Sequence, residues 1–454
     1  MCKAGGDSVR KKISRLLVTM FIGFTLTLII SCILLIINSV GVSDGTKLEA
    51  VSIDPDSDVS SVYKKIDEVS VEVSEVSQVN VNVDSEYNFG FRSLSDTNEQ
   101  YLYHKLMRNL YYITDQKSDS GYFKAERITV SRCEMTEDSI RHALNAYIAD
   151  NPQVFWVSNV FGYAYSDGNT IIECYSVIPA DKITELSLIL SKKINEMLED
   201  LDTKMDDYHI ERYIHDKLLR NCSYAEEIKS VNDGWEYFTS YGAIVNGSAV
   251  CEGYSKAMQM LLNLTGIPSY IIRGEAEGVK HMWNLVKVGE EWYHLDSTWN
   301  DSDTTISYEY FNLPTNLVEE NHIIDSLIGT GDDEADRTGP NFFIPECNSM
   351  EMNFYTVDGF TIERFDNETD QNVVAQIVHL VNNGEVYLHI NVGSELSYDE
   401  CIDTLFNAPG HRIYHYIDLA NELLDSDHKL SREGMKLLKH EDRGQLRIRL
   451  NYNL

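Results

Sequence analysis

The N-terminal residues divide into a short basic segment and a long apolar stretch. Residues 1–15 carry five Lys or Arg and one Asp, and 22 residues without a charged side chain follow, from Leu16 to Ile37. In a helix that rises about 1.5 Å per residue, this stretch is long enough to cross a hydrocarbon layer of about 30 Å. The pattern therefore predicts a transmembrane anchor over residues 16–38.

The charges around this stretch predict on which side of the membrane the rest of the chain lies. Basic residues before an apolar segment favour retention of that end in the cytoplasm, so we expect the bulk of the chain to be extracytoplasmic. A cleaved signal peptide is the alternative, although its apolar core usually spans about 7–15 residues. The residues after the stretch, Asn38-Ser39-Val40-Gly41, make a poor cleavage site.

Residues 43–95 are rich in Ser, Val, Asp and Glu, as in the repeated Val-Ser and Val-Glu pairs of residues 69–77. The alternation of Val with polar residues could form a strand, but no turn and partner segment accompany it. Acidic, low-complexity sequence of this kind is typical of disordered segments. We interpret the segment as an extended tether.

Periodic patterns begin at residue 96 and predict an α+β chain with three modules. The first, residues 96–204, is an N-terminal α+β module. Its predicted elements are helices at 97–112, 137–149 (capped by Thr136) and 181–205, and strands at 127–132 and 170–177. The third, residues 340–454, is a smaller α/β module without recognisable chemistry. Its predicted elements are strands at 360–365, 385–392 and 445–452, and helices at 370–382, 398–406 and 411–424.

The middle module, residues 205–330, contains the residues that suggest chemistry. A helix at 207–220 and a loop at 241–250 precede a helix that starts at Cys251 and ends near Gly266. The free N–H groups and the dipole at a helix N-terminus favour the thiolate form of a cysteine, which is the nucleophilic form. The same N–H groups could also hold an oxyanion.

A strand at 269–273 is followed by a predicted hairpin, with strands at 280–288 and 291–299 and a turn at Gly289-Glu290. A two-residue turn pairs Val288 with Glu291. In that register His281 and Asp296 lie on one face as diagonal neighbours, about 7–8 Å apart at Cα. The pattern therefore predicts a base beside a carboxylate that could orient it.

Composition narrows the function classes. The chain has 454 residues, is 43% hydrophobic and has a net charge of −34, which makes a general nucleic-acid partner improbable. No phosphate-binding loop and no Cys/His cluster for zinc is present, so we expect no cofactor and no metal. The eight cysteines form no disulfide framework, although a Cys133–Cys174 bridge is conceivable.

Three sequence blocks carry a resemblance to a known family. Residues 250–255 (Val-Cys-Glu-Gly-Tyr-Ser), 281–284 (His-Met-Trp-Asn) and 293–299 (Tyr-His-Leu-Asp-Ser-Thr-Trp) resemble the transglutaminase-like superfamily, in particular its exported bacterial branch. The resemblance implies a papain-like α+β core on which Cys251 is the nucleophile, His281 the general base and acid, and Asp296 the residue that orients His281. Ser255 and Met282 depart from the common pattern, and neither is expected to touch this triad.

The resemblance implies an enzyme that forms an acyl-enzyme at a carboxamide or peptide carbonyl of a protein or peptide, such as a cell-wall peptide or surface protein. An amine would complete a transamidation and water a hydrolysis, and the residues do not decide between them. The calcium that animal members need is not evident. The alternative is a non-catalytic surface binding or adhesion protein on the same fold. We expect His215 and His294 to be packing residues, not catalytic ones.

Overall fold

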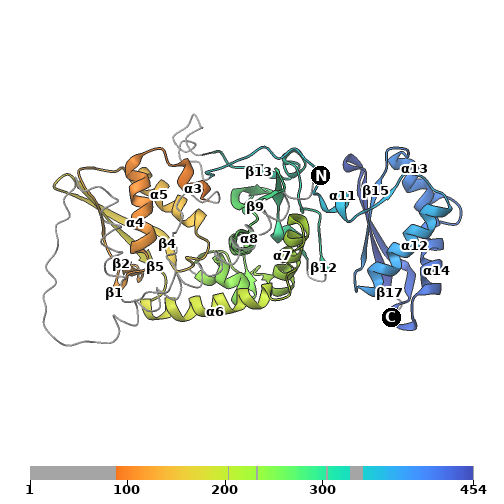
Figure 1. Ribbon diagram of the computed structural model, residues 1–454, viewed down its shortest axis with the longest axis horizontal. Helices are drawn as coiled ribbons and strands as arrows, with labels where there is room; N and C mark the ends of the chain where they lie inside the picture. The colour runs from red at the N-terminus through yellow and green to blue at the C-terminus, as the bar shows by residue number, and fades with distance from the viewer. Residues whose placement is uncertain (1–87, 203, 232–233, 303–304, 328–340, 453–454) are drawn as a thin grey trace, which may run out of the picture. The chain divides into compact units, whose positions relative to one another are not determined.

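The computed structural model describes residues 88–452 except 203, 232–233, 303–304 and 328–340 (Figure 1). The described chain divides into two compact units between Glu199 and Asp200, with Leu264–Gly266 grouped with the first. The predicted basic segment, the anchor at 16–38 and most of the tether lie outside the described residues. Within the described part, no helix has both the length and the apolar character that a membrane span needs.

The first unit is an antiparallel sheet with helices. The strands are β1 (Ile113–Lys117), β2 (Phe123–Ala125), β3 (Ile128–Val130), β4 (Val157–Ser166) and β5 (Asn169–Ser176), in the order β1-β2-β5-β3 with β4 also paired to β5. The helices are α3 (Phe89–Ser93), α4 (Thr97–Asn109), α5 (Glu137–Asp150) and α6 (Ala180–Leu198). The predicted cap of α5 is confirmed, because the hydroxyl of Thr136 accepts the Ser139 N–H. Helix α6 ends at Leu198, earlier than predicted.

One prediction for this unit is wrong, and one possibility that the sequence left open is not realised. The tether was predicted to reach residue 95, but α3 packs on α5, where the Asp150 carboxylate accepts the N–H groups of Gly90 and Phe91 at 2.8 Å. The bridge between Cys133 and Cys174 does not form, and both cysteines are free. The hydroxyl of Thr170, four residues before Cys174, donates to the carbonyl of Cys133.

The central part of the second unit joins helices to a four-stranded antiparallel sheet of order β10-β9-β8-β13. Its strands are β8 (Ser269–Ala276), β9 (Val279–Val288), β10 (Glu291–Leu295) and β13 (His322–Ile324), and its helices are α7 (Asp207–Asn221), α8 (Cys251–Thr265), α9 (Ser297–Asn300) and α10 (Thr315–Val318). The predicted hairpin register is confirmed, because Val288 pairs with Glu291. The stretch predicted as a loop at 241–250 instead contains a π-helical turn, Gly242–Asn246, and β7 (Ser248–Ala249), which pairs in parallel with β6 (Ser223–Tyr224).

The C-terminal part of the second unit has a mixed sheet of order β14-β15-β17-β16, with α12 and α14 on one face (Figure 1). Its elements are α11 (Phe354–Val357), β14 (Phe360–Ile362), α12 (Asn367–Asn382), β15 (Tyr387–Val392), α13 (Tyr398–Ile402), α14 (Arg412–Leu423), β16 (Leu430–His440) and β17 (Gln445–Tyr452). The sequence did not predict β16, whose side chains are mostly polar and exposed or half-buried. Two short strands, β11 (Asp301–Ser302) and β12 (Thr305–Ile306), pair in the central part.

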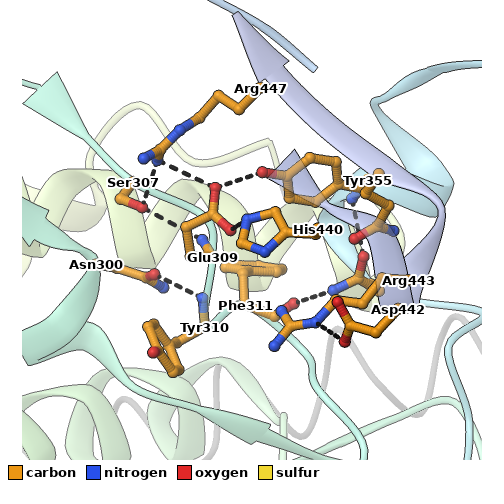
Figure 2. Close-up of polar contacts among 12 residues, drawn as sticks. Asn300, Ser307, Glu309, Tyr310, Phe311, Tyr355, His440, Asp442, Arg443 and Arg447 are labelled. Atoms are coloured by element: carbon orange, nitrogen blue, oxygen red, sulfur yellow. Dashed lines mark hydrogen bonds and ion pairs between the residues drawn. The ribbon is translucent and has the colours of Figure 1, made fainter. Parts of the chain in front are cut away.

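A buried carboxylate joins the C-terminal part to the central part. Glu309 lies in the central part and contacts His440, Tyr355 and Arg447, the last at 3.2 Å (Figure 2). Burial alone would raise the pKa of Glu309, but its bond to His440 and the charge of Arg447 lower this pKa to about 2. Ionised Glu309 therefore stabilises the attachment of the C-terminal part.

We expect Glu309→Gln to lower the free energy of unfolding at pH 7 by about 3 kcal/mol, because the partners of the lost charge stay buried. Because the pKa of Glu309 is lowered in the folded state, the difference in free energy of unfolding between the wild type and Glu309→Gln is fully present above about pH 4.5. It shrinks as the pH falls towards 2. Denaturant unfolding of the full chain at several pH values measures both effects.

Glu320→Gln is the matched control. Glu320 also crosses to the C-terminal part, where it pairs with Arg443 at 3.1 Å, but its side chain is 46% exposed. An exposed ion pair contributes about 0–1 kcal/mol. Equal losses in the two variants would contradict a special role for Glu309.

Candidate active site

Cys251 is the first residue of α8 and is partly exposed. The chain enters this helix from β7, whose Ala249 packs against Gly253. A Cβ atom on Gly253 would lie 2.6 Å from the carbonyl oxygen of Tyr237 and 2.7 Å from the Cβ of Ala249. Glycine is therefore needed for the close approach of the first turn of α8, which carries Cys251, to the segments of Tyr237 and Ala249.

Ser255 joins helix α8, which starts at Cys251, to strand β9, which carries His281. Its hydroxyl lies 2.8 Å from the carbonyl oxygen of Cys251 and 3.0 Å from that of Met282, and donates its one proton to either. The Asn284 amide also donates to the Ser255 carbonyl at 3.0 Å. The prediction that Ser255 and Met282 do not touch the triad is therefore wrong. Ser255 contacts the backbone carbonyl of Cys251, and the carbonyl of Met282 contacts the same Ser255 hydroxyl.

His281 and Asp296 meet through a buried hydrogen bond. Nε2 of His281 lies 2.6 Å from Oδ2 of Asp296, and the two residues are only 8% and 2% exposed. A carboxylate can only accept, so the imidazole donates from Nε2 and leaves Nδ1 for the Cys251 thiol. The prediction that these two side chains meet is therefore confirmed.

The local geometry of Asp296 differs from the prediction. Residues 291–299 were predicted as one strand, but β10 ends at Leu295 and α9 begins at Ser297. Asp296 is the N-cap of α9, and its Oδ1 accepts the Trp299 N–H at 3.0 Å. Because aspartate is a favoured N-cap residue, this interaction ends the strand and fixes one carboxylate oxygen.

The charges of the three residues reinforce one another. Burial lowers the pKa of His281, but the charge and hydrogen bond of Asp296, with smaller contributions from Cys251, outweigh it and raise this pKa to about 10. Burial would raise the pKa of Asp296, yet His281 and then His322 hold it well below its usual range. The site is thus arranged to carry an imidazolium between a carboxylate and a thiol.

His322, on β13, is a residue that the sequence analysis missed. Its Nε2 lies 3.1 Å from the same oxygen of Asp296 that contacts His281, and its side chain is fully buried. It lies 26 residues after Asp296, outside the three sequence blocks. Only the pairing of β13 with β8 brings it to the site, so no local sequence signal could have identified it.

Among the described residues, His281, Asp296 and His322 are the group whose ligand atoms lie close enough to hold a metal ion, all within 4.8 Å. Two ligands of one tetrahedral zinc ion lie roughly 3.3 Å apart. The 2.6 Å between His281 and Asp296 is shorter than this and fits a shared proton. The donor set as arranged is therefore a hydrogen-bonded network.

The other histidines and tryptophans near the site are packing residues. His294 accepts the Trp283 indole N–H at 3.0 Å, and burial and then His322 lower its pKa to about 3, so it stays neutral. His215 is fully buried on α7 and contacts Asn300 at 3.2 Å. The Trp299 ring packs against the His322 ring in a tilted arrangement, with centroids 4.7 Å apart. These positions agree with the expected packing roles.

A cavity of about 490 Å³ lies between α7 and β15. Tyr224 is one of its lining residues, and burial and then the charges of Cys251 and Asp296 raise the pKa of Tyr224. The cavity therefore extends to a residue that lies close to the candidate nucleophile. Four acidic residues also line it, namely Asp216, Glu226, Asp301 and Glu385.

We expect Asp296→Asn to lower the pKa of the His281 imidazolium from about 10 towards or below 6.5. The neutral amide supplies no negative charge to offset the lowering of this pKa by burial. The pH dependence of Cys251 alkylation by iodoacetamide, followed on the Cys251 peptide by mass spectrometry, reports this upper inflection. The rate of acyl transfer through Cys251 should fall roughly 10²–10⁴-fold in the same variant.

The control for this charge removal is Glu275→Gln. Glu275 is a more exposed carboxylate on β8, in the register position next to the partner of His281. Solvent screens such a charge, so the upper inflection should not move. A similar shift in both variants would mean that Asp296 acts only through general charge.

Comparisons with known proteins agree with part of this picture. Residues 195–297 match the family model of the transglutaminase-like superfamily. The comparison with curated proteins found no match.

Three solved structures are similar to the chain at 14% sequence identity each. They are a TGase (TM-score 0.26, covering 47% of this chain and 61% of that one), a "putative protease" from Parabacteroides distasonis (0.21, 31% and 35%) and a "putative cysteine protease" from Cytophaga hutchinsonii (0.21, 39% and 68%). The chain thus spans less than two thirds of the first two structures. With TM-scores this low, these likenesses add nothing to the family match.

Proposed function

We propose that this chain, which contains a transglutaminase-like domain at residues 195–297, is a membrane-anchored extracytoplasmic cysteine enzyme. It forms an acyl-enzyme at a carboxamide or peptide carbonyl of a protein or peptide. The observation that carries the proposal is the buried 2.6 Å bond between His281 and Asp296, with Cys251 at a helix N-terminus on the other side of the imidazole.

The proposed reaction begins with the thiolate of Cys251 and the imidazolium of His281. Sγ attacks the carbonyl carbon, and as the C–N bond breaks, the proton on Nδ1 of His281 passes to the leaving amine or ammonia. A thioester remains on Cys251. His281, now neutral, takes a proton from the incoming amine or water as it attacks the thioester carbonyl; the C–S bond then breaks, the product leaves, and the Cys251 thiolate beside the His281 imidazolium is restored. Throughout, Asp296 holds Nε2 of His281.

The start of α8 supports the proposal electrostatically. The free N–H groups of a helix's first turn and its dipole favour both a thiolate and a developing oxyanion at that place. The cavity is large enough for part of a substrate chain, and one of its lining residues, Tyr224, feels the charge of Cys251. We propose this cavity as one side of the substrate cleft.

The membrane anchor rests on the sequence of residues 16–38, an uncharged stretch behind a basic segment. With this anchor in place, the catalytic domain would face outwards at the end of the acidic tether. Cell-wall peptides and surface proteins are the substrates that such a position would favour.

The test uses the full chain with a glutamine-containing protein and a labelled primary amine. Covalent incorporation of the label means transamidation, and release of fragments means hydrolysis. Either activity should fall by at least about 10³-fold in Cys251→Ser, because hydroxyl replaces the nucleophile. The control is Cys133→Ser, which removes another partly exposed free cysteine and should stay active.

Two outcomes would contradict the enzymatic proposal. One is activity that survives Cys251→Ser. The other is a wild-type chain that yields neither product while Cys251 is alkylated no faster than Cys133, which would favour the non-catalytic binding protein.

A further inference from the structure

The carboxylate of Asp296 receives two histidines on one oxygen. His281 approaches Oδ2 at 2.6 Å and His322 approaches the same atom at 3.1 Å, while Oδ1 is taken by the Trp299 N–H. Because an ionised carboxylate accepts only, both histidines donate from Nε2. Asp296 is thus held by three donors from three separate segments.

His322 is itself rigidly held. Its Nδ1 lies 2.6 Å from the side chain of Asn321, whose amide also bonds the Tyr310 hydroxyl. The ring packs edge-to-face on Trp283, with centroids 5.0 Å apart, and against Trp299 at 4.7 Å.

The sheet is built so that the two histidines can converge. Gly274 on β8 pairs with His281 of β9 on one side and with Ile324 of β13 on the other. A Cβ atom on Gly274 would collide with the carbonyl oxygen of Ile323 and lie 3.0 Å from the Trp283 ring. Glycine here lets β13 approach closely enough for His322 to reach across β8 to Asp296.

We propose that His322 is a positioning residue that holds the Asp296 carboxylate in the orientation that His281 requires. This inference rests on the proposed function and adds a fourth side chain to the site. Without the His322 donor, Oδ2 keeps one partner, and the carboxylate can turn about its Cβ–Cγ bond away from His281. Transition-state geometry is sensitive to such a displacement, since about 1 Å can change a rate by about 10²-fold.

The alkaline behaviour of His281 distinguishes positioning from other roles. The groups that face its site are Cys251 on α8, Asp296 after β10 and His322 on β13, with the hydroxyls of Tyr224 and Tyr310 near Asp296. If His322 positions Asp296, its loss weakens the hold on the imidazolium, and the upper inflection moves to lower pH. If His322 only weakens the attraction of the Asp296 charge for the His281 imidazolium, its loss moves the upper inflection to higher pH.

The experiment compares His322→Gln with His322→Asn in the full chain. The amide nitrogen of Gln reaches about as far as Nε2 of histidine, whereas that of Asn reaches only about as far as Nδ1. We expect His322→Gln to keep the wild-type inflection and activity within about 3-fold. His322→Asn should lower kcat by about 10–100-fold with KM within about 3-fold, and should move the inflection in the direction of Asp296→Asn.

The alkylation readout needs no turnover, so it tests the positioning role even if the proposed reaction fails. Circular dichroism and thermal unfolding establish that both variants fold, and the Gln variant supplies the comparison if the Asn variant does not. Three outcomes overturn the inference. These are equal behaviour of the two variants, a shift of the inflection to higher pH in His322→Asn, and faster alkylation of wild-type Cys251 after chelation by EDTA, which would mean that the cluster holds a metal ion.

Discussion

The hydrogen bond between Asp296 and His281 is the interaction on which the site depends. A buried carboxylate is strongly destabilising unless donors surround it. Asp296 is 2% exposed and meets this requirement with His281, His322 and the Trp299 N–H. The end of β10, the short helix α9 and the glycine that admits β13 all serve to supply these donors.

The same requirement links the site to the rest of the second unit. The Asp296 N–H donates to the carbonyl of Tyr310, whose own N–H donates to the Asn300 side chain. The next residue back, Glu309, is the buried carboxylate that the C-terminal part surrounds with His440, Tyr355 and Arg447 (Figure 2). The C-terminal part therefore holds the segment on which Asp296 rests, which is a structural role that its sequence did not suggest.

The family match and the geometry describe different parts of the site. Residues 195–297 include Cys251, His281 and Asp296, whose order along the chain carries the resemblance. His322 lies beyond this match and enters only through strand pairing. A domain that is recognised by its reactive residues can thus rely on supporting residues that no short motif records.

The sequence by itself determined the elements whose signals are local. The N-cap Thr136, the start of α8 at Cys251 and the pairing of Val288 with Glu291 depend on neighbouring residues, and the structure has them as predicted. The shared face of His281 and Asp296 followed from that pairing. Tertiary structure decided what depends on distant residues, namely the burial of α3 on α5 and the arrival of His322 at the carboxylate. These outcomes come from desolvation and strand pairing between segments far apart in the chain, and neither leaves a periodic signal in the local sequence.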